Sequence, residues 1–126
     1  MRRNKAVNER ILLVDDDTSI REVVVFLLET EGYRVSVAAN GQQALDLLHK
    51  GVLPRVIILD LNMPVMDGWR FRAEQLADPT LREIPVIVTT GLSNPPTEAM
   101  GRITVLPKPI ELDALVASIE EQLEAA

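Results

Sequence analysis

The sequence predicts an α/β fold in which one parallel sheet has helices on both faces. Short apolar runs alternate along the chain with segments whose apolar residues recur at helical spacing. Runs this apolar are typical of strands buried on both faces. The 126 residues are one domain's worth of chain. The expected strands are 11–15, 33–38, 56–59, 84–90 and 103–106.

The helices are expected from capping residues and stop signals. Asp17 or Thr18 would cap a first helix that ends near Glu31, because Gly32 follows it. The turn Asn40-Gly41 precedes the second helix, and Asp67-Gly68 precedes the third. Pro85 is tolerable only at the first position of its strand. The expected helices are 18–31, 42–49, 69–76, a short one between Pro96 and Gly101, and 111–124.

Two of the expected strands have predictable places in the sheet. Residues 56–59 are the most apolar run and should lie at the centre, whereas residues 33–38 alternate and should form an edge. The basic segment 1–9 lacks the apolar stretch of a signal peptide and is expected to be a leader before a domain at 10–126.

Composition excludes several classes of function. The formal charge of −6 argues against nucleic acid as a direct partner of this chain. The absence of cysteine excludes disulfides, thiolate metal sites and cysteine nucleophiles, and is compatible with the cytoplasm. No apolar stretch approaches the roughly 18 residues that span a bilayer, so no membrane association is expected.

Polar residues end four of the expected strands. Asp15 and Asp16 follow the first strand, Asp60 the third, Thr90 the fourth and Lys108 the fifth. Ligands of open parallel sheets collect at the carboxyl ends of the strands, so these side chains should converge on one pocket. Alone, each has an ordinary explanation as a helix cap, a strand end or a solvated lysine. Together they suit a divalent cation and a phosphoryl group.

The three carboxylates predict a magnesium site. Two like charges about 4 Å apart repel by roughly 4 kcal/mol at an effective dielectric near 20, and a third charge worsens this. Mg²⁺ takes oxygen ligands and keeps several waters, so Asp15, Asp16 and Asp60 with a backbone carbonyl would suffice. Asp60 is the nucleophile candidate, because an ionised carboxylate can attack phosphorus without a base. Lys108 and Thr90 could offset or bind the phosphoryl charge.

The motifs that carry these residues resemble the receiver domain of two-component response regulators. They are ILLVDDD (11–17), IILDLNMPVMDG (57–68), IPVIVTTG (84–91) and LPKPI (106–110), and the likeness covers about residues 10–124. The resemblance implies a flavodoxin-like fold with strand order 2-1-3-4-5 and a site at the switch between the first and third strands.

The resemblance also implies roles for individual residues. Asp60 would accept a phosphoryl group from the phosphohistidine of a sensor histidine kinase or a histidine phosphotransfer protein. Asp15, Asp16, Asp60 and the backbone carbonyl of Asn62 would hold Mg²⁺. Lys108 would pair with the acceptor. The chain would then switch its affinity for a downstream protein, as a monomer or weak homodimer.

The signalling end of the chain departs from the family pattern. Thr90 would be the switch hydroxyl, but Val105 stands where the family often has the aromatic residue that moves with it. Only the 17 residues 91–107 separate Thr90 from Lys108, so the fourth helix should be shortened. By the same resemblance, Asn62 and Leu92 would occupy positions that tune hydrolysis of the aspartyl phosphate in the family. Apolar Leu92 should shield the phosphate and lengthen its lifetime.

Three alternatives stay open from the sequence. A haloacid-dehalogenase-like phosphatase would use Asp15 as nucleophile and Asp17 as acid–base, but it would leave the Asp60 motif without a purpose. A receiver fold could also bind a partner without being phosphorylated. The chain could equally be the receiver excised from a longer regulator.

Overall fold

The computed structural model describes residues 9–125, so the expected basic leader lies almost entirely outside the described residues. The chain forms a five-stranded parallel sheet with the order β2-β1-β3-β4-β5. This order confirms the expected fold class. The strands are β1 (Arg10–Val14), β2 (Arg34–Ala38), β3 (Val56–Asp60), β4 (Val86–Thr90) and β5 (Thr104–Pro107).

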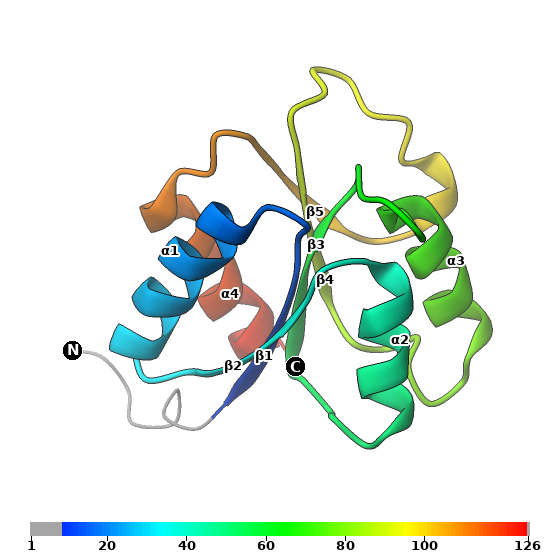
Figure 1. Ribbon diagram of the computed structural model, residues 1–126, viewed down its shortest axis with the longest axis horizontal. Coiled ribbons are helices and arrows are strands. Elements are labelled where there is room, and N and C mark those ends of the chain that lie inside the picture. Colours follow the sequence, from blue (N-terminus) through cyan, green and yellow to red (C-terminus); the bar gives the residue numbers. More distant parts are fainter. Residues whose placement is uncertain (1–8, 126) are drawn as a thin grey trace.

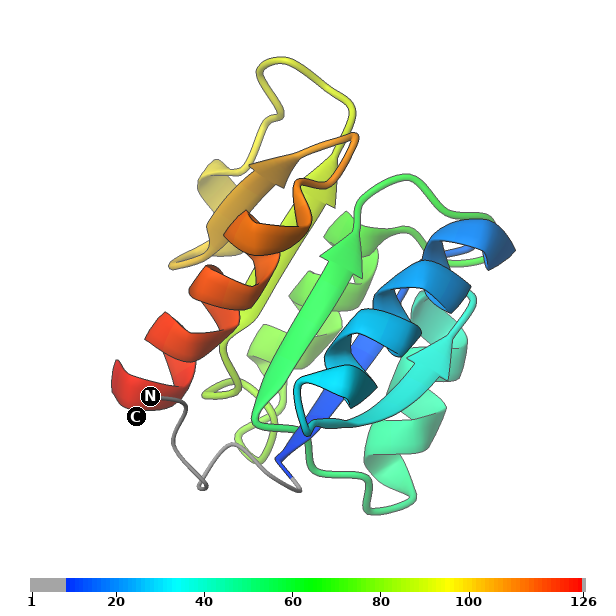
Figure 2. The same ribbon diagram turned by 90° about the vertical axis from the view of Figure 1, so that its left-hand side faces the viewer.

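Helices cover both faces of the sheet. Figure 1 shows α1 and α4 on one side of the strands and α2 and α3 on the other. Figure 2 shows α1 and α4 running across the near face, with the sheet behind them. The helices are α1 (Thr18–Thr30), α2 (Gly41–His49), α3 (Gly68–Ala77) and α4 (Leu112–Ala125), with one 3₁₀ turn, η2 (Glu98–Met100).

Alternation along the strands divides the core into two clusters. In β1, Leu12 and Val14 belong to the cluster under α2 and α3, whereas Ile11 and Leu13 belong to the cluster under α1 and α4. Successive residues of a strand point to opposite faces, which is why one strand supplies both clusters. Every residue of β3 is buried, as expected for the central strand.

Side-chain caps begin the first three helices. Asp17 accepts a hydrogen bond from Ile20 N in α1, Asn40 accepts one from Gln43 N in α2, and Asp67 accepts one from Arg70 N in α3. Each cap satisfies a backbone donor that has no partner inside the helix. The caps set where each helix starts after its strand, and so shape the loops at the carboxyl edge of the sheet.

The region between β4 and β5 contains the main departure from a regular α/β alternation. The expected short helix is a single 3₁₀ turn, η2, and no α-helix covers this stretch. Smaller differences occur at strand ends: Pro85 lies just before β4, and β1 ends at Val14, one residue earlier than expected. Asp15 still donates its backbone N–H to Ala38 O at 3.1 Å. Within residues 9–125, no helix combines the length and apolarity that crossing a bilayer requires.

Candidate phosphoryl-acceptor site

The structure brings the predicted acidic residues together at the carboxyl edge of the sheet. Asp15 follows β1 and is buried, Asp60 is the last residue of β3 and is buried, and Asp16 is exposed. Carboxylate oxygens from all three lie within 4.8 Å of one another. Because β1 and β3 are neighbours in the sheet, their ends are forced side by side.

Lys108 follows β5, and its side chain reaches this cluster of carboxylates. Its Nζ lies 3.2 Å from Asp15 Oδ2 and 3.2 Å from Asp60 Oδ1. Its backbone N–H donates to Thr90 O at 2.7 Å, which ties the residue after β5 to the end of β4. One ammonium therefore bridges two carboxylates that come from different strands.

Burial and charge shift the ionisation of this group. Burial, followed by repulsion from Asp15, raises the pKa of Asp60 above its ordinary 3.8, and Lys108 only partly offsets this rise. For Lys108, burial lowers the pKa, but attraction to Asp15 and Asp60 outweighs burial and leaves the pKa above 10.5. Lys108 is therefore a cation at neutral pH. The ionised form of Asp60 is less favourable in the folded chain than it would be in water.

Two nearby side chains hold the backbone of the acidic loop. Asp15 Oδ1 accepts from Asp17 N at 2.9 Å, and Asp15 O accepts from Arg21 Nη1 at 2.6 Å. Asp17 Oδ1 is engaged by Ile20 N at 3.1 Å, as expected for a cap. Sequence reasoning missed Arg21. The only available signal was a basic residue one helical turn after the cap.

The loop between β3 and α3 packs against Asp60 and Leu61 through a glycine, and against α2 through another. A Cβ on Gly68 would lie 2.5 Å from Asp60 O and 2.8 Å from Leu61 Cα, so a side chain there would force α3 away from β3. A Cβ on Gly41 would lie 2.8 Å from Met66 Cγ. Gly68 N donates to Leu61 O at 2.8 Å, and Gly41 N donates to Met66 O at 2.9 Å. The two glycines let the loop sit directly on β3 and α2.

The tip of this loop is strained. Val65 has φ 68°, and Met66 N donates to Pro64 O at 2.7 Å, which closes a three-residue turn on Val65. A β-branched residue in this conformation costs about 1–3 kcal/mol. Val65 is 82% exposed, so core packing does not explain why it is held this way.

The predicted switch and hydrolysis-tuning residues lie in different environments. Thr90 is buried, and its Oγ1 accepts from Leu92 N at 3.0 Å. Asp60 pairs in register with Thr89, which places Thr90 one residue further along β4. Leu92 and Val105 are both exposed, and Asn62 is exposed in the loop after β3.

Comparison with known proteins identifies the family of this chain. The family model of the response regulator receiver domain matches residues 11–120. The Bacillus subtilis sporulation initiation phosphotransferase F is 32% identical over 122 residues, which cover 93% of this chain and 95% of that protein. The chain belongs to the response regulator receiver domain family and has a phosphorelay role. Receiver domains are generally signalling modules rather than enzymes.

Solved structures give the same result. A signal receiver domain of a histidine kinase from Syntrophus aciditrophicus has a TM-score of 0.85 and 31% identity, covering 94% of this chain and 92% of that chain. The Vibrio cholerae chemotaxis response regulator CheY4 has a TM-score of 0.82 and 31% identity, covering 92% and 99%. Other relatives are longer: the match to a probable transcriptional regulator of Guillardia theta, 38% identical over 86 residues, covers 68% of this chain and 32% of that protein.

Proposed function

We propose that Asp60 is the phosphoryl acceptor and that its donor is the phosphohistidine of a sensor histidine kinase or a histidine phosphotransfer protein. The observation that carries this proposal is the position of Lys108 Nζ, 3.2 Å from both Asp15 and Asp60. A buried carboxylate beside a fixed ammonium and two further carboxylates is suited to receive a phosphoryl group. We also propose that the transfer from the donor to Asp60 takes place in the cytoplasm.

The transfer needs no proton to move at Asp60. One oxygen of the ionised carboxylate attacks phosphorus, and the P–N bond to the histidine breaks. The electron pair of that bond stays on the ring nitrogen, and a proton on the other ring nitrogen lets the histidine leave as a neutral imidazole. Lys108 reduces the repulsion between the carboxylate and the incoming phosphoryl oxygens. The acidic loop, held by Arg21, keeps Asp15 in place during this step.

The residues present fit a magnesium ion. Carboxylate oxygens of Asp15, Asp16 and Asp60 lie within 4.8 Å of one another, and hard oxygen donors of this kind suit Mg²⁺. These three residues, with the backbone carbonyl of Asn62, would hold the ion. When bound, it would neutralise negative charge on the phosphoryl oxygens.

The phosphorylated state would be read at the end of β4. Thr90 Oγ1 accepts from Leu92 N, which leaves its hydroxyl proton available to donate to a phosphoryl oxygen. A shift of Thr90 towards the phosphoryl group would move the segment after β4 and change affinity for a downstream protein. Val105 has no ring, so an aromatic rotamer change at this position does not carry the signal.

The deciding experiment is phosphodonor labelling followed by mass mapping of the modified residue. Acetyl phosphate with Mg²⁺ should add one phosphoryl group at Asp60, and chelator should greatly reduce this labelling. Asp60→Asn should remove it, while Asp46→Asn, an exposed carboxylate on α2, should leave it intact. Labelling at full stoichiometry in Asp60→Asn would contradict the proposal.

The same experiment separates the alternatives. Multiple turnovers of a phosphomonoester that depend on Asp15 would favour a phosphatase, although the Asp17 carboxylate is already engaged as a helix cap. No labelling under any condition would favour a binding module that works without phosphorylation.

A further inference from the structure

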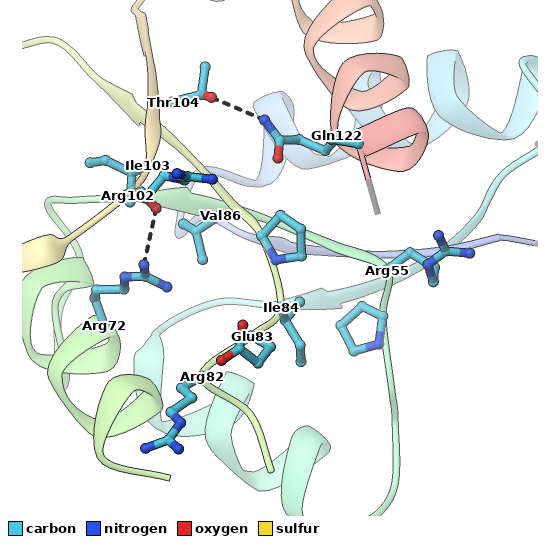
Figure 3. Close-up of a pocket in the computed structure, with 13 residues that line it drawn as sticks. Arg55, Arg72, Arg82, Glu83, Ile84, Val86, Arg102, Ile103, Thr104 and Gln122 are labelled. Carbon is cyan, nitrogen blue, oxygen red and sulfur yellow. Dashed lines mark hydrogen bonds between the residues drawn. The ribbon is translucent and has the colours of Figure 1, made fainter. Parts of the chain in front are cut away.

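A cavity lies at the opposite edge of the sheet from Asp60. It has a volume of about 720 Å³ and opens between the amino ends of β3, β4 and β5 and the last turn of α4 (Figure 3). Val86 and Thr104, the first residues of β4 and β5, line it, as does Gln122 of α4. Cavities of roughly 300–1,000 Å³ are the usual size for small-molecule sites.

Arginines dominate the charged lining of this cavity. Arg55, Arg72, Arg82 and Arg102 line it against one acidic residue, Glu83. Arg55 is paired with Glu9 at 3.0 Å. Within residues 9–125, the other three arginines form no ion pair with a carboxylate. In a chain with a net charge of −6, this concentration of unpaired positive charge is unusual.

Arg72 is the most informative of these residues. Its side chain reaches from α3 towards Arg102 (Figure 3), and only 5% of the residue is exposed. Its guanidinium donates to Met100 O at 2.8 Å, to Gln75 Oε1 at 2.8 Å and to Arg102 O at 3.2 Å. These acceptors are all neutral. A buried charge is ordinarily paired with an opposite charge, and a guanidinium has five N–H donors, of which these bonds use three.

The rest of the lining is partly apolar. Ile84, Pro85, Val86 and Ile103 contribute side chains, and Gln122 Nε2 donates to Thr104 Oγ1 at 3.2 Å across one wall. A ligand that matches this lining has an anionic group that pairs with the arginines. The rest of such a ligand is apolar or planar and packs against the apolar residues. Arginine is well suited to the anionic part, because its planar fork binds phosphate oxygens in pairs.

We propose that this cavity binds a small phosphate ester of about the size of a nucleoside monophosphate. Arg72 lies at the buried edge of the site. Arg82 and Arg102 are exposed, and the Arg82 guanidinium, which points away from Arg72 in Figure 3, would turn towards the phosphate on binding. The site lies at the amino ends of strands whose carboxyl ends carry Asp60 and Thr90. Binding is therefore separate from the acceptor chemistry and does not depend on the proposed function.

The test uses the full chain with Asp60→Asn in chelator, so that neither magnesium nor phosphorylation contributes. Adenosine monophosphate, inorganic pyrophosphate and uncharged adenosine are titrated while amide chemical shifts are recorded. We expect saturable shifts with adenosine monophosphate at residues 82–86 and 102–104, and no saturation with adenosine. Pyrophosphate, which carries the charge without the planar body, should bind more weakly than adenosine monophosphate.

Matched variants assign the binding to the arginines. Arg82→Ala and Arg102→Ala should each weaken binding by about tenfold, the loss of one charge-assisted contact. Arg34→Ala, which removes an exposed arginine of β2, should leave affinity unchanged. Both test residues are exposed, so these variants should fold normally, and circular dichroism checks this.

Three outcomes would overturn the proposal. The first is an absence of saturable shifts with both phosphate probes. The second is equal binding of adenosine and adenosine monophosphate, and the third is unchanged affinity in the double variant of Arg82 and Arg102. Labelling of Asp60 in the native chain is measured separately, so failure here is distinguishable from failure of the acceptor assignment.

Discussion

At the scale of single residues, the acceptor site concentrates like charge that the fold must tolerate. Asp15 and Asp60 are buried beside each other, with Asp16 at the rim and one ammonium between the two buried carboxylates. Val65 adds backbone strain at the tip of the neighbouring loop. Such features reduce stability locally, and they lie where the chemistry is proposed to occur.

Removing the acceptor charge should stabilise the metal-free fold. Burial, then repulsion by Asp15, raises the pKa of Asp60 above 3.8, so the folded chain binds this proton more tightly than the unfolded chain. Unfolding free energy should therefore fall as pH rises from 3.8 through the raised pKa. We expect Asp60→Asn to gain roughly 1–2 kcal/mol at pH 7 in chelator, measured by urea unfolding. The gain should disappear below pH 3.8.

Asp46→Asn serves as the control for this measurement, because it removes an exposed carboxylate of α2. Its stability should stay within about 0.5 kcal/mol of the native chain at every pH. A metal-free Asp60→Asn protein that is less stable than the native chain at pH 7 would show that the contact with Lys108 outweighs the repulsion.

Relief of strain at Val65 should also stabilise the fold. Asparagine tolerates positive φ far better than a β-branched residue, and the position is 82% exposed. We expect Val65→Asn to raise the unfolding free energy by about 1 kcal/mol. Val65→Ile keeps the β-branch and should show no gain. If both variants have the same unfolding free energy, strain at this residue does not limit stability.

The apolar side chain of Leu92 should lengthen the life of the phosphorylated state. Leu92 follows Thr90 by two residues, and its backbone N–H donates to Thr90 Oγ1. A carboxylate at this position could position an attacking water. We expect Leu92→Glu to shorten the half-life of phosphorylated Asp60 several-fold, measured as loss of label after the donor is removed.

Leu53→Glu places the same charge at an exposed leucine just before β3, at the amino edge of the sheet. It should leave the half-life unchanged. Decay that is no slower in the native chain than in Leu92→Glu would count against the shielding role of Leu92.

At the scale of elements, the segment between β4 and β5 is anchored to α3 rather than shaped by a helix of its own. Trp69 Nε1 donates to Pro96 O at 2.8 Å. Arg72 donates to Met100 O and Arg102 O, at the two ends of the turn that follows η2. Since α3 begins at the loop after Asp60, these contacts link the acceptor loop to the segment that follows Thr90.

Loss of the indole contact should loosen that segment. We expect Trp69→Phe, which keeps an aromatic ring but removes the donor, to cost about 1 kcal/mol of unfolding free energy. Amide hydrogen exchange should rise in residues 91–103 and stay unchanged in β1. Arg70→Ala removes the neighbouring side chain, which pairs with Glu74 at the surface, and should change neither quantity. Equal amide hydrogen exchange of residues 91–103 in the native and Trp69→Phe proteins would show that the bond from Trp69 to Pro96 does not hold this segment.

At the scale of the whole molecule, charge is separated between the two edges of the sheet. Carboxylates gather where β1 and β3 end, and arginines gather where β3, β4 and β5 begin. The parallel arrangement of all five strands produces this separation, because every carboxyl end lies at the same edge. A cation should therefore stabilise one edge and an anion the other.

Magnesium should raise stability by mass action at the acidic edge. A ligand that binds only the folded chain adds about 2.7 kcal/mol at 100 times its dissociation constant. We expect the thermal midpoint to rise with Mg²⁺ in the native chain and to rise much less in Asp16→Asn. Asp46→Asn should respond like the native chain. Equal responses in Asp16→Asn and the native chain would remove Asp16 from the proposed ligand set.

Hydrophobic periodicity and turn residues were sufficient to predict the strands and the four α-helices, whereas the strand order was implied by the resemblance to receiver domains. Val56–Asp60 is apolar enough to be central, Gly32 marks the stop after α1, and the spacing between Thr90 and Lys108 leaves little room for a helix. These are local properties, because the periodicity of helices and strands and the preference for turns depend on residues that are close in the sequence. The convergence of Asp15, Asp60 and Lys108 followed from them, because parallel strands end at one edge.

The contacts that depend on distant parts of the chain were not predictable in this way. Nothing near Arg21 in the sequence indicates that it bonds the carbonyl of Asp15, and no local pattern requires positive φ at Val65. The bonds from Arg72 to the turn after η2, 28 and 30 residues away, exist only because α3 packs beside that segment. Packing between elements places such residues together, so only the folded chain reveals the cavity at the amino edge of the sheet and its arginines.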